Sequence, residues 1–294
     1  MPETQLKLTP YGNADFAYIR EEGMAYVDKT QFIEVLERCG SNYPFIVRPR
    51  RFGKTLSTNM LEAYYDEAAA DQFDRVFAGT YIGSHKTPLA SQFRVLHLDF
   101  SGIASPNHQV LAAEFQETVL SGVRSYFQRY PHPEQNEVLK GTFPSASALI
   151  SRFFSLLTEE FPRKLYVIID EYDQFANEVL SQDLVHFKAM TSSEGFLKNF
   201  FTKLKAATNR LVSRIFITGV TSISLDSMTS GFSISTNITT FPAFADLYGF
   251  TEAELRELVP QVLDISKWGL NVDDLVARMR EWYRYMSRYF KKIG

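Results

Sequence analysis

The chain has 294 residues, of which 45% are hydrophobic and 22% are charged, and its formal net charge at pH 7 is −3. This composition predicts a globular protein with a large core, and the small negative charge excludes a general attraction to nucleic acid or to anionic membranes. The single cysteine, Cys39, excludes an internal disulfide and a cysteine-rich zinc site. Residues 1–7 lack a signal-peptide pattern and no apolar run approaches about 18 residues, so we expect an intracellular protein, cytoplasmic or nuclear, that does not enter a membrane.

An apolar strand is predicted at residues 45–48, and a short loop joins it to a helix at residues 56–65. Strand, Gly-Lys-Thr and helix in this order are typical of a phosphate-binding P-loop. In such a loop Gly53 lets the backbone approach an anion, Lys54 reaches the β and γ phosphates, and Thr55 places a hydroxyl on Mg²⁺. The predicted nucleotide-binding residues are Arg48, Arg50, Arg51, Phe52, Gly53, Lys54, Thr55 and Leu56.

The start of this loop departs from the usual pattern. Arg48 stands where the first glycine is expected, and Pro49 has no N–H to offer a phosphate. A lone Gly-Lys-Thr is also compatible with an ordinary turn into a helix, so the loop alone leaves both interpretations open.

Further along the chain, apolar strands alternate with helical patterns, which is the order expected of an α/β sheet. The predicted elements are strand 94–100, helices 110–130 and 145–161, strand 165–170, helix 196–209, strand 214–220 and a fifth strand at 237–241. Strand 165–170 is apolar on both faces, which favours a mostly parallel sheet of five strands between two layers of helices. A loop rich in serine and threonine is expected at residues 225–240.

Strand 165–170 ends in two carboxylates and is typical of a Walker B element. Asp170 would lie at the carboxyl end of the strand and hold Mg²⁺ through its water shell, and Glu171 would polarise the attacking water. The alternative is that both residues cap a following helix. Beside a Gly-Lys-Thr loop, the nucleotide interpretation is favoured.

Thr218 ends strand 214–220, at a position that often senses the γ phosphate in P-loop ATPases with a strand inserted between the P-loop and Walker B strands. An ordinary threonine at a strand end is the equal alternative. If the sensor interpretation holds, the catalytic residues are Lys54, Glu171 and Thr218.

The C-terminal part of the chain is predicted to be helical. Thr251 and Glu254 form a capping box, and Pro260 helps to end the helix that they open. A last helix at 272–291 has an apolar face, predicted to pack as a lid, beside a basic stripe that is either solvated or a contact for nucleic acid. The face consists of Met279, Tyr283, Met286 and Phe290, and the stripe of Arg280, Arg284 and Arg288.

Six blocks in register make the chain resemble the AAA-ATPase-like family, a P-loop family whose members are commonly fused to a C-terminal nuclease-like domain of the PD-(D/E)XK type. The blocks are residues 26–30, the loop and helix at 48–61, Ile169-Asp170-Glu171-Tyr172-Asp173, Thr218-Gly219, the segments 229–232 and 237–238, and 249–254. The resemblance implies that the Arg48-Pro49-Arg50-Arg51 run is the family's own form of the loop. It also marks Asp28 and Lys29, for which the sequence suggests no role.

The expected organisation is an N-terminal segment at 1–42 packed on the core, a P-loop ATPase core at 43–245 and a helical lid at 246–294. After Tyr283 the chain no longer matches the family and stops before the nuclease-like domain. No Glu-x-Lys or Asp-x-Lys tripeptide, which that nuclease site requires, occurs in the sequence.

The sequence therefore predicts a Mg²⁺-dependent domain that binds ATP and ADP and hydrolyses ATP slowly. The absence of an Asn-Lys-x-Asp guanine-reading motif favours adenine. A nucleotide-loaded switch with negligible turnover and a relic that binds nothing are the alternatives. An arginine finger from a neighbouring copy in a homo-oligomer is compatible with this reading, and nucleic acid would bind only weakly.

Overall fold

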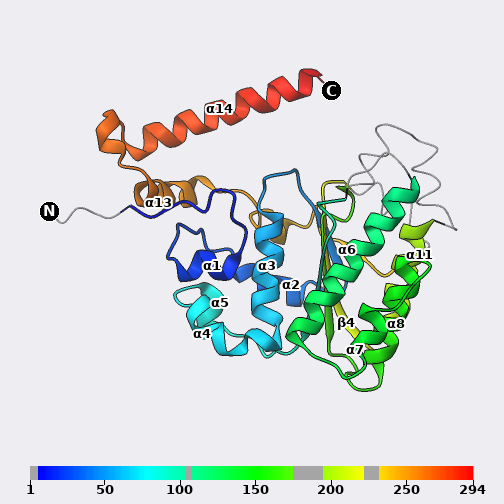
Figure 1. Cartoon of the computed structure of the whole chain (residues 1–294). Helices are drawn as coiled ribbons and strands as arrows, with labels where there is room; N and C mark the ends of the chain where they lie inside the picture. Colours follow the sequence, from blue (N-terminus) through cyan, green and yellow to red (C-terminus); the bar gives the residue numbers. More distant parts are fainter. Residues whose placement is uncertain (1–5, 104–107, 175–194, 222–231, 294) are drawn as a thin grey trace.

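The computed structural model describes residues 6–103, 108–174, 195–221 and 232–293. Its elements follow one another in the α/β order predicted (Figure 1). The strands are β1 (Pro44–Val47), β2 (Arg94–Asp99), β3 (Leu165–Asp170), β4 (Val212–Gly219) and β5 (Thr236–Asn237). The α-helices are α1 (Phe16–Glu21), α2 (Gln31–Arg38), α3 (Lys54–Tyr65), α4 (Phe73–Val76), α5 (Tyr81–Ser84), α6 (His108–Arg129), α7 (Gln135–Leu139), α8 (Ala146–Thr158), α11 (Phe196–Ala207), α13 (Glu252–Val262) and α14 (Val272–Ile293). Three 3-10 helices are η1 (Glu67–Gln72), η2 (Pro242–Phe244) and η3 (Ile265–Trp268).

The five strands form one parallel sheet in the order β2-β3-β4-β1-β5. The strand β1 before the P-loop and β3, the predicted Walker B strand, therefore both neighbour β4, which lies between them, as the strand-insertion interpretation predicts. Because all five strands are parallel, their carboxyl ends meet at one edge, where ligands bind in open α/β sheets.

Two layers of helices cover the sheet, and alternate strand residues enter each layer. Even-numbered residues of β3, such as Tyr166 and Ile168, pack with α1 to α4, whereas Val167 and Ile169 pack with α6, α8 and α11. Figure 1 shows α3 and α6 on opposite sides of the strands. This double burial explains why β3 is apolar at every position before its terminal aspartate.

The fifth strand is shorter than the predicted strand at 237–241, because side-chain bonding replaces the ladder. Ile238 N–H still donates to Phe45 O at 3.0 Å, but Val47 N–H donates to the Thr239 hydroxyl at 3.1 Å. Pro242 then begins η2. Of the expected loop at 225–240, residues 225–231 lie outside the described residues.

The capping box that opens α13 is present: Thr251 Oγ1 accepts from Glu254 N–H, and Glu254 Oε2 accepts from Thr251 N–H. The expectation that Pro260 ends this helix is wrong, since α13 continues through it to Val262. A proline lacks the N–H that would bond the residue four positions earlier, and its ring crowds that residue's carbonyl, but in the last turn of α13 little helix follows that could be disrupted.

The helix α14 packs against α13, and in Figure 1 α13 lies between α14 and the rest of the chain. Val276 is buried in this contact, and Arg280 forms an ion pair with Glu252. Arg280 therefore has a partner within the chain. The side chains from residue 283 onward, which complete the predicted apolar face and basic stripe, lie outside the described part. None of the described helices is both long enough and apolar enough to cross a membrane.

Candidate functional site

The loop between β1 and α3 has the backbone of an anion-binding turn. Arg51 and Gly53 have positive φ angles of 67° and 86°, and Gly53 is the N-cap of α3. The first N–H groups of a helix have no partner inside the helix, so those at the start of α3 are available at the carboxyl edge of the sheet.

Lys54 is the charged residue at the centre of this site, and its side chain is only 2% exposed. The ammonium Nζ lies 3.2 Å from Pro49 O and 3.6 Å from Glu171 Oε1. One carbonyl and one long ion-pair contact leave donor capacity on an ammonium with three N–H groups. A buried cation in this state is suited to a phosphate.

Asp170 is fully buried at the end of β3. Its Oδ1 accepts from Glu171 N–H at 3.0 Å and from the Thr218 hydroxyl, whereas Oδ2 is buried and has no hydrogen-bond partner in the described part of the chain. A buried carboxylate oxygen without a donor is costly unless a cation approaches it. This oxygen suits Mg²⁺, which takes one or two carboxylates together with phosphate oxygens and waters.

Glu171 follows in a left-handed conformation, with φ of 50°. Burial raises the pKa of its carboxyl, the Lys54 ammonium opposes that rise, and the charges of Asp170 and Asp99 add to it. Thr218 is fully buried and links the two acidic residues, because its Oγ1 also accepts from Glu171 N–H at 3.3 Å. The structure thus brings Lys54, Asp170, Glu171 and Thr218 together.

The remaining predicted loop residues divide into two groups. Arg50 and Arg51 are exposed, and Arg50 donates to Gln174 Oε1 at 2.8 Å, shortly after the end of β3. Phe52 is 41% exposed, and Thr55 and Leu56 are half-buried in the first turn of α3.

Arg48 points elsewhere. Its guanidinium donates to Val47 O at 2.9 Å and to Thr239 O at 3.0 Å, and it lies over the Tyr248 ring. The structure therefore places Arg48 as a support between β1 and the segment after β5, with its guanidinium on backbone carbonyls.

Comparison with known proteins agrees with this geometry. The model of the family described as "Predicted AAA-ATPase" matches residues 10–229, which is more than half of the chain. The chain belongs to this family. It is also 26% identical over 281 residues to "Uncharacterized protein in vnfD 5'region" of Azotobacter chroococcum mcd 1; the match covers 94% of this chain and 48% of that relative, so the chain spans about half of the relative's length. No solved structure matches the chain.

Sequence reasoning missed two residues that shape this AAA-ATPase-like site. Asp173 is fully buried, and its carboxylate accepts from Val220 N–H at 2.9 Å and from Thr221 N–H at 2.5 Å, which fixes the chain after β4. A Cβ at Gly219 would lie 2.4 Å from the Tyr172 ring and 2.6 Å from Asp173 Oδ1, so only glycine fits there. The family block at 169–173 contains Asp173 but does not indicate what it binds.

Asp99 is a third such residue, because it ends β2 in register with Asp170. It is exposed, and its Oδ1 accepts from Ser101 N–H at 2.9 Å. The rule that placed Asp170 at the carboxyl edge applies equally to strand 94–100 and would have located Asp99.

Asp28 and Lys29, the family-marked residues, connect the N-terminal segment to distant parts of the chain. Asp28 accepts from Thr30 N–H at 2.9 Å and from Tyr81 N–H at 2.6 Å. Lys29 Nζ lies 2.6 Å from Glu254 Oε1, in the capping box of α13, and 2.6 Å from Asp246 O. Lys29 thereby joins the segment before α2 to the start of the C-terminal helices.

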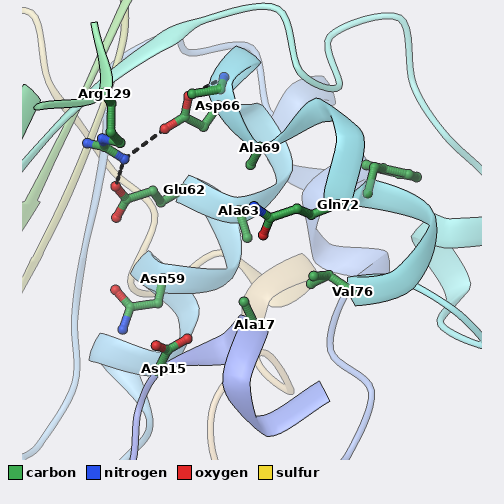
Figure 2. Close-up of a pocket in the computed structure, with 12 residues that line it drawn as sticks. Asp15, Ala17, Asn59, Glu62, Ala63, Asp66, Ala69, Gln72, Val76 and Arg129 are labelled. Carbon is green, nitrogen blue, oxygen red and sulfur yellow. Dashed lines mark hydrogen bonds and ion pairs between the residues drawn. The ribbon is translucent and has the colours of Figure 1, made fainter. Parts of the chain in front are cut away.

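A cavity lies away from the P-loop, at the C-terminal half of α3. It is a cavity of about 430 Å³ between α1, α3, the turn through η1 and α4, and Arg129 at the end of α6. Figure 2 shows Arg129 between Glu62 and Asp66, with an ion pair to each. Because Arg129 is paired with both carboxylates, it is not available to bind an anion in the way that Lys54 is.

Proposed function

We propose that this chain is a Mg²⁺-dependent ATP-binding domain and a slow ATPase that forms ADP and phosphate. The observation that carries the proposal is the juxtaposition of the buried Lys54 ammonium with the Asp170 oxygen that has no donor among the described residues. The first is suited to phosphate and the second to a divalent cation, and both lie where the P-loop helix begins.

Within this proposal each residue has a distinct task. Lys54 and the helix N–H groups bind the β and γ phosphates, and the exposed Arg50 and Arg51 add positive charge beside them. Thr55 and Asp170 would hold Mg²⁺, and the cation would supply positive charge that neutralises the phosphates.

Glu171 would accept a proton from the attacking water. Its backbone N–H donates to Asp170 Oδ1 and Thr218 Oγ1, which fixes the residue beside Lys54, and the raised pKa of its carboxyl brings that group nearer to the range of a useful general base. The Thr218 hydroxyl donates to Asp170 here. We therefore assign it first to the orientation of that carboxylate and second to a role as phosphate sensor.

One observation favours a nucleotide-loaded switch as the second candidate. The P-loop helix is bonded directly to the segment that leads to α13, because Ser57 Oγ and Tyr248 Oη lie 2.8 Å apart. Since Arg48 also lies over the Tyr248 ring, both sides of the loop contact this segment. A phosphate-driven shift of the loop would reach the C-terminal helices even without turnover.

The test is calorimetric titration of Mg·ATP into the wild type and Lys54→Ala, with phosphate release measured in parallel. Lys54→Ala should lose roughly 100-fold or more in ATP affinity, since the charge-assisted bonds to two phosphates disappear, and should keep its fold. Lys164→Ala, which removes an exposed lysine paired with Glu67, is the matched control and should bind normally.

Undiminished ATP binding by Lys54→Ala would show that the P-loop assignment is wrong. Tight binding by the wild type without phosphate release above the uncatalysed background would favour the switch.

A further inference from the structure

Two buried polar atoms without hydrogen-bond partners in the described part of the chain lie on neighbouring strands. One is Asp170 Oδ2 at the end of β3, and the other is Nε2 of His97 on β2. One is a carboxylate acceptor and the other a nitrogen that can donate, so their chemistry is complementary.

The sheet places these two side chains on the same face. The β2–β3 register pairs Asp99 with Asp170 and His97 with Ile168. His97 therefore lies two residues before Asp99, the last residue of β2. Side chains two positions apart in a strand share a face, and that face is the one covered by α3. His97 and Asp170 are therefore diagonal neighbours beneath the P-loop helix.

His97 is held in place from its other side. Its Nδ1 lies 2.5 Å from Glu62 Oε2, and Glu62 in turn is paired with Arg129 (Figure 2). Arg129 also donates to Val95 O at 2.9 Å, on the outer edge of β2. The imidazole is thus held by two charged groups, Glu62 and Arg129, which connect it to the cavity at the C-terminal half of α3.

Nδ1 is occupied by Glu62, so Nε2 is the ring nitrogen that remains for a further hydrogen bond, and it has no partner in the described part of the chain. One water molecule can bond Nε2 and a carboxylate oxygen at the same time, so such a bridge does not depend on the protonation state of the ring.

We propose that His97 is a positioning residue of the metal site, whose Nε2 bonds one bridging water that donates to Asp170 Oδ2 and orients that carboxylate toward the cation. Together with Thr218, which bonds the other oxygen, His97 then fixes both oxygens of Asp170. This inference rests on the proposed function of Asp170. Outer partners of this kind typically change metal affinity by about 10- to 100-fold.

The experiment compares two substitutions of similar size, His97→Gln and His97→Met, in the full chain. Both remove the ring and its Nδ1 bond to Glu62, but only glutamine keeps an N–H donor near the place of Nε2. Mn²⁺ affinity of the ADP complex, measured by electron paramagnetic resonance, should fall about 10-fold in His97→Met and much less in His97→Gln. His132→Met is the control, because His132 is also buried but pairs with Glu160.

ADP affinity in EDTA serves as the second readout and should be equal in all four proteins. If the wild type binds neither ADP nor Mn²⁺, the proposed function fails. If the wild type binds both and His97→Met matches it in Mn²⁺ affinity, the role of His97 is overturned while the nucleotide site stands.

A measurement on the wild type covers the case in which His97→Met does not fold. In protein labelled with ¹⁵N-histidine, addition of Mg²⁺ to the ADP complex should shift the Nε2 resonance of His97 and leave that of His132 unchanged. An unmoved His97 resonance would contradict the proposal.

Discussion

The two ends of α3 carry charges in opposite states. At the N-terminal end, the Lys54 ammonium has a long contact to Glu171 at 3.6 Å, and exposed arginines stand beside it. At the C-terminal end, Glu62 and Asp66 are closed in by Arg129, and Asp66 also accepts from the Tyr130 hydroxyl. The N-terminal end of α3 thus has a cation with only a distant counter-charge, and we call it the open end. At the C-terminal end the charges are paired, and we call it the closed end.

Both ends place charges against the dipole of the helix. Anions are favoured at a helix N-terminus and cations at its C-terminus, whereas α3 begins with a lysine and has Glu62 in its last turn. At the C-terminal end Arg129 supplies the missing cation from another helix. At the N-terminal end, no anion among the described residues supplies the missing negative charge at close range, and a bound phosphate would. A charged group whose counter-charge comes from within the protein stabilises the fold, whereas a charged group whose counter-charge is missing indicates a binding site for a ligand.

The largest expected effect is on the closed end. Glu62→Gln should destabilise the protein by about 3 kcal/mol, because it leaves Arg129 and His97 short of a buried counter-charge. Chemical denaturation at pH 7 measures the change. Glu117→Gln, which removes an exposed partner of Arg124, is the control and should change stability by less than about 1 kcal/mol. An equal, small loss in both variants would show that the ionic cluster contributes little.

The closed end should also determine part of the acid sensitivity. Burial by itself raises the pKa of Glu62, but His97 and Arg129 lower it from 4.5 to about 2. A carboxyl with a depressed folded-state pKa contributes stability above its unfolded pKa and loses it as the pH falls through the folded value. The wild-type advantage over Glu62→Gln should therefore shrink between pH 4.5 and pH 2. A constant difference between the two proteins across that range would contradict the ion-pair explanation.

The next effect is on the open end. Glu171→Gln should keep ATP bound and lower turnover by roughly 100-fold, or about 2.7 kcal/mol in the barrier, since the residue acts on water and not on the phosphates. Phosphate release and calorimetric binding measure the two quantities separately. Equal background rates in both proteins, with ATP bound by both, would remove the ATPase proposal and retain the switch.

A smaller effect tests how tightly the site is built. Gly219→Ala should destabilise the protein by about 1–3 kcal/mol, because a methyl group there overlaps Tyr172 and Asp173. Gly102→Ala is the control, since a Cβ at Gly102 meets no atom within 4 Å and should cost little. Thermal unfolding compares the two variants, and equal melting temperatures would show that the turn with Tyr172 and Asp173 can shift.

The smallest effect concerns the link to the C-terminal helices. Thr251→Ala removes the N-cap hydroxyl of α13 and should cost about 1 kcal/mol. Thr202→Ala, in the exposed middle of α11, should be nearly neutral. If ATP affinity falls in Thr251→Ala at temperatures where the protein is folded, the C-terminal helices take part in nucleotide binding.

The strands of this protein could be predicted closely because burial acts on them locally. The prediction of strand 165–170 is confirmed at both ends, since a run buried on both faces cannot alternate with polar residues. The end of β5 could not be predicted, because it depends on the Thr239 hydroxyl bonding Val47, which is far away in sequence.

The sequence by itself determined which local units carry the functional groups and in which order they follow along the chain. A strand, Gly-Lys-Thr and a helix form a local unit, and an apolar strand that ends in Asp170 and Glu171 forms another, so short-range patterns are sufficient to recognise both. Only the tertiary structure decided which charged groups have a partner within the protein. Arg48 donates to backbone carbonyls, Glu62 pairs with Arg129, and Asp170 Oδ2 has no donor among the described residues. The sequence does not show these outcomes, because ion pairs and hydrogen bonds form between groups that only the packing of distant elements brings within reach.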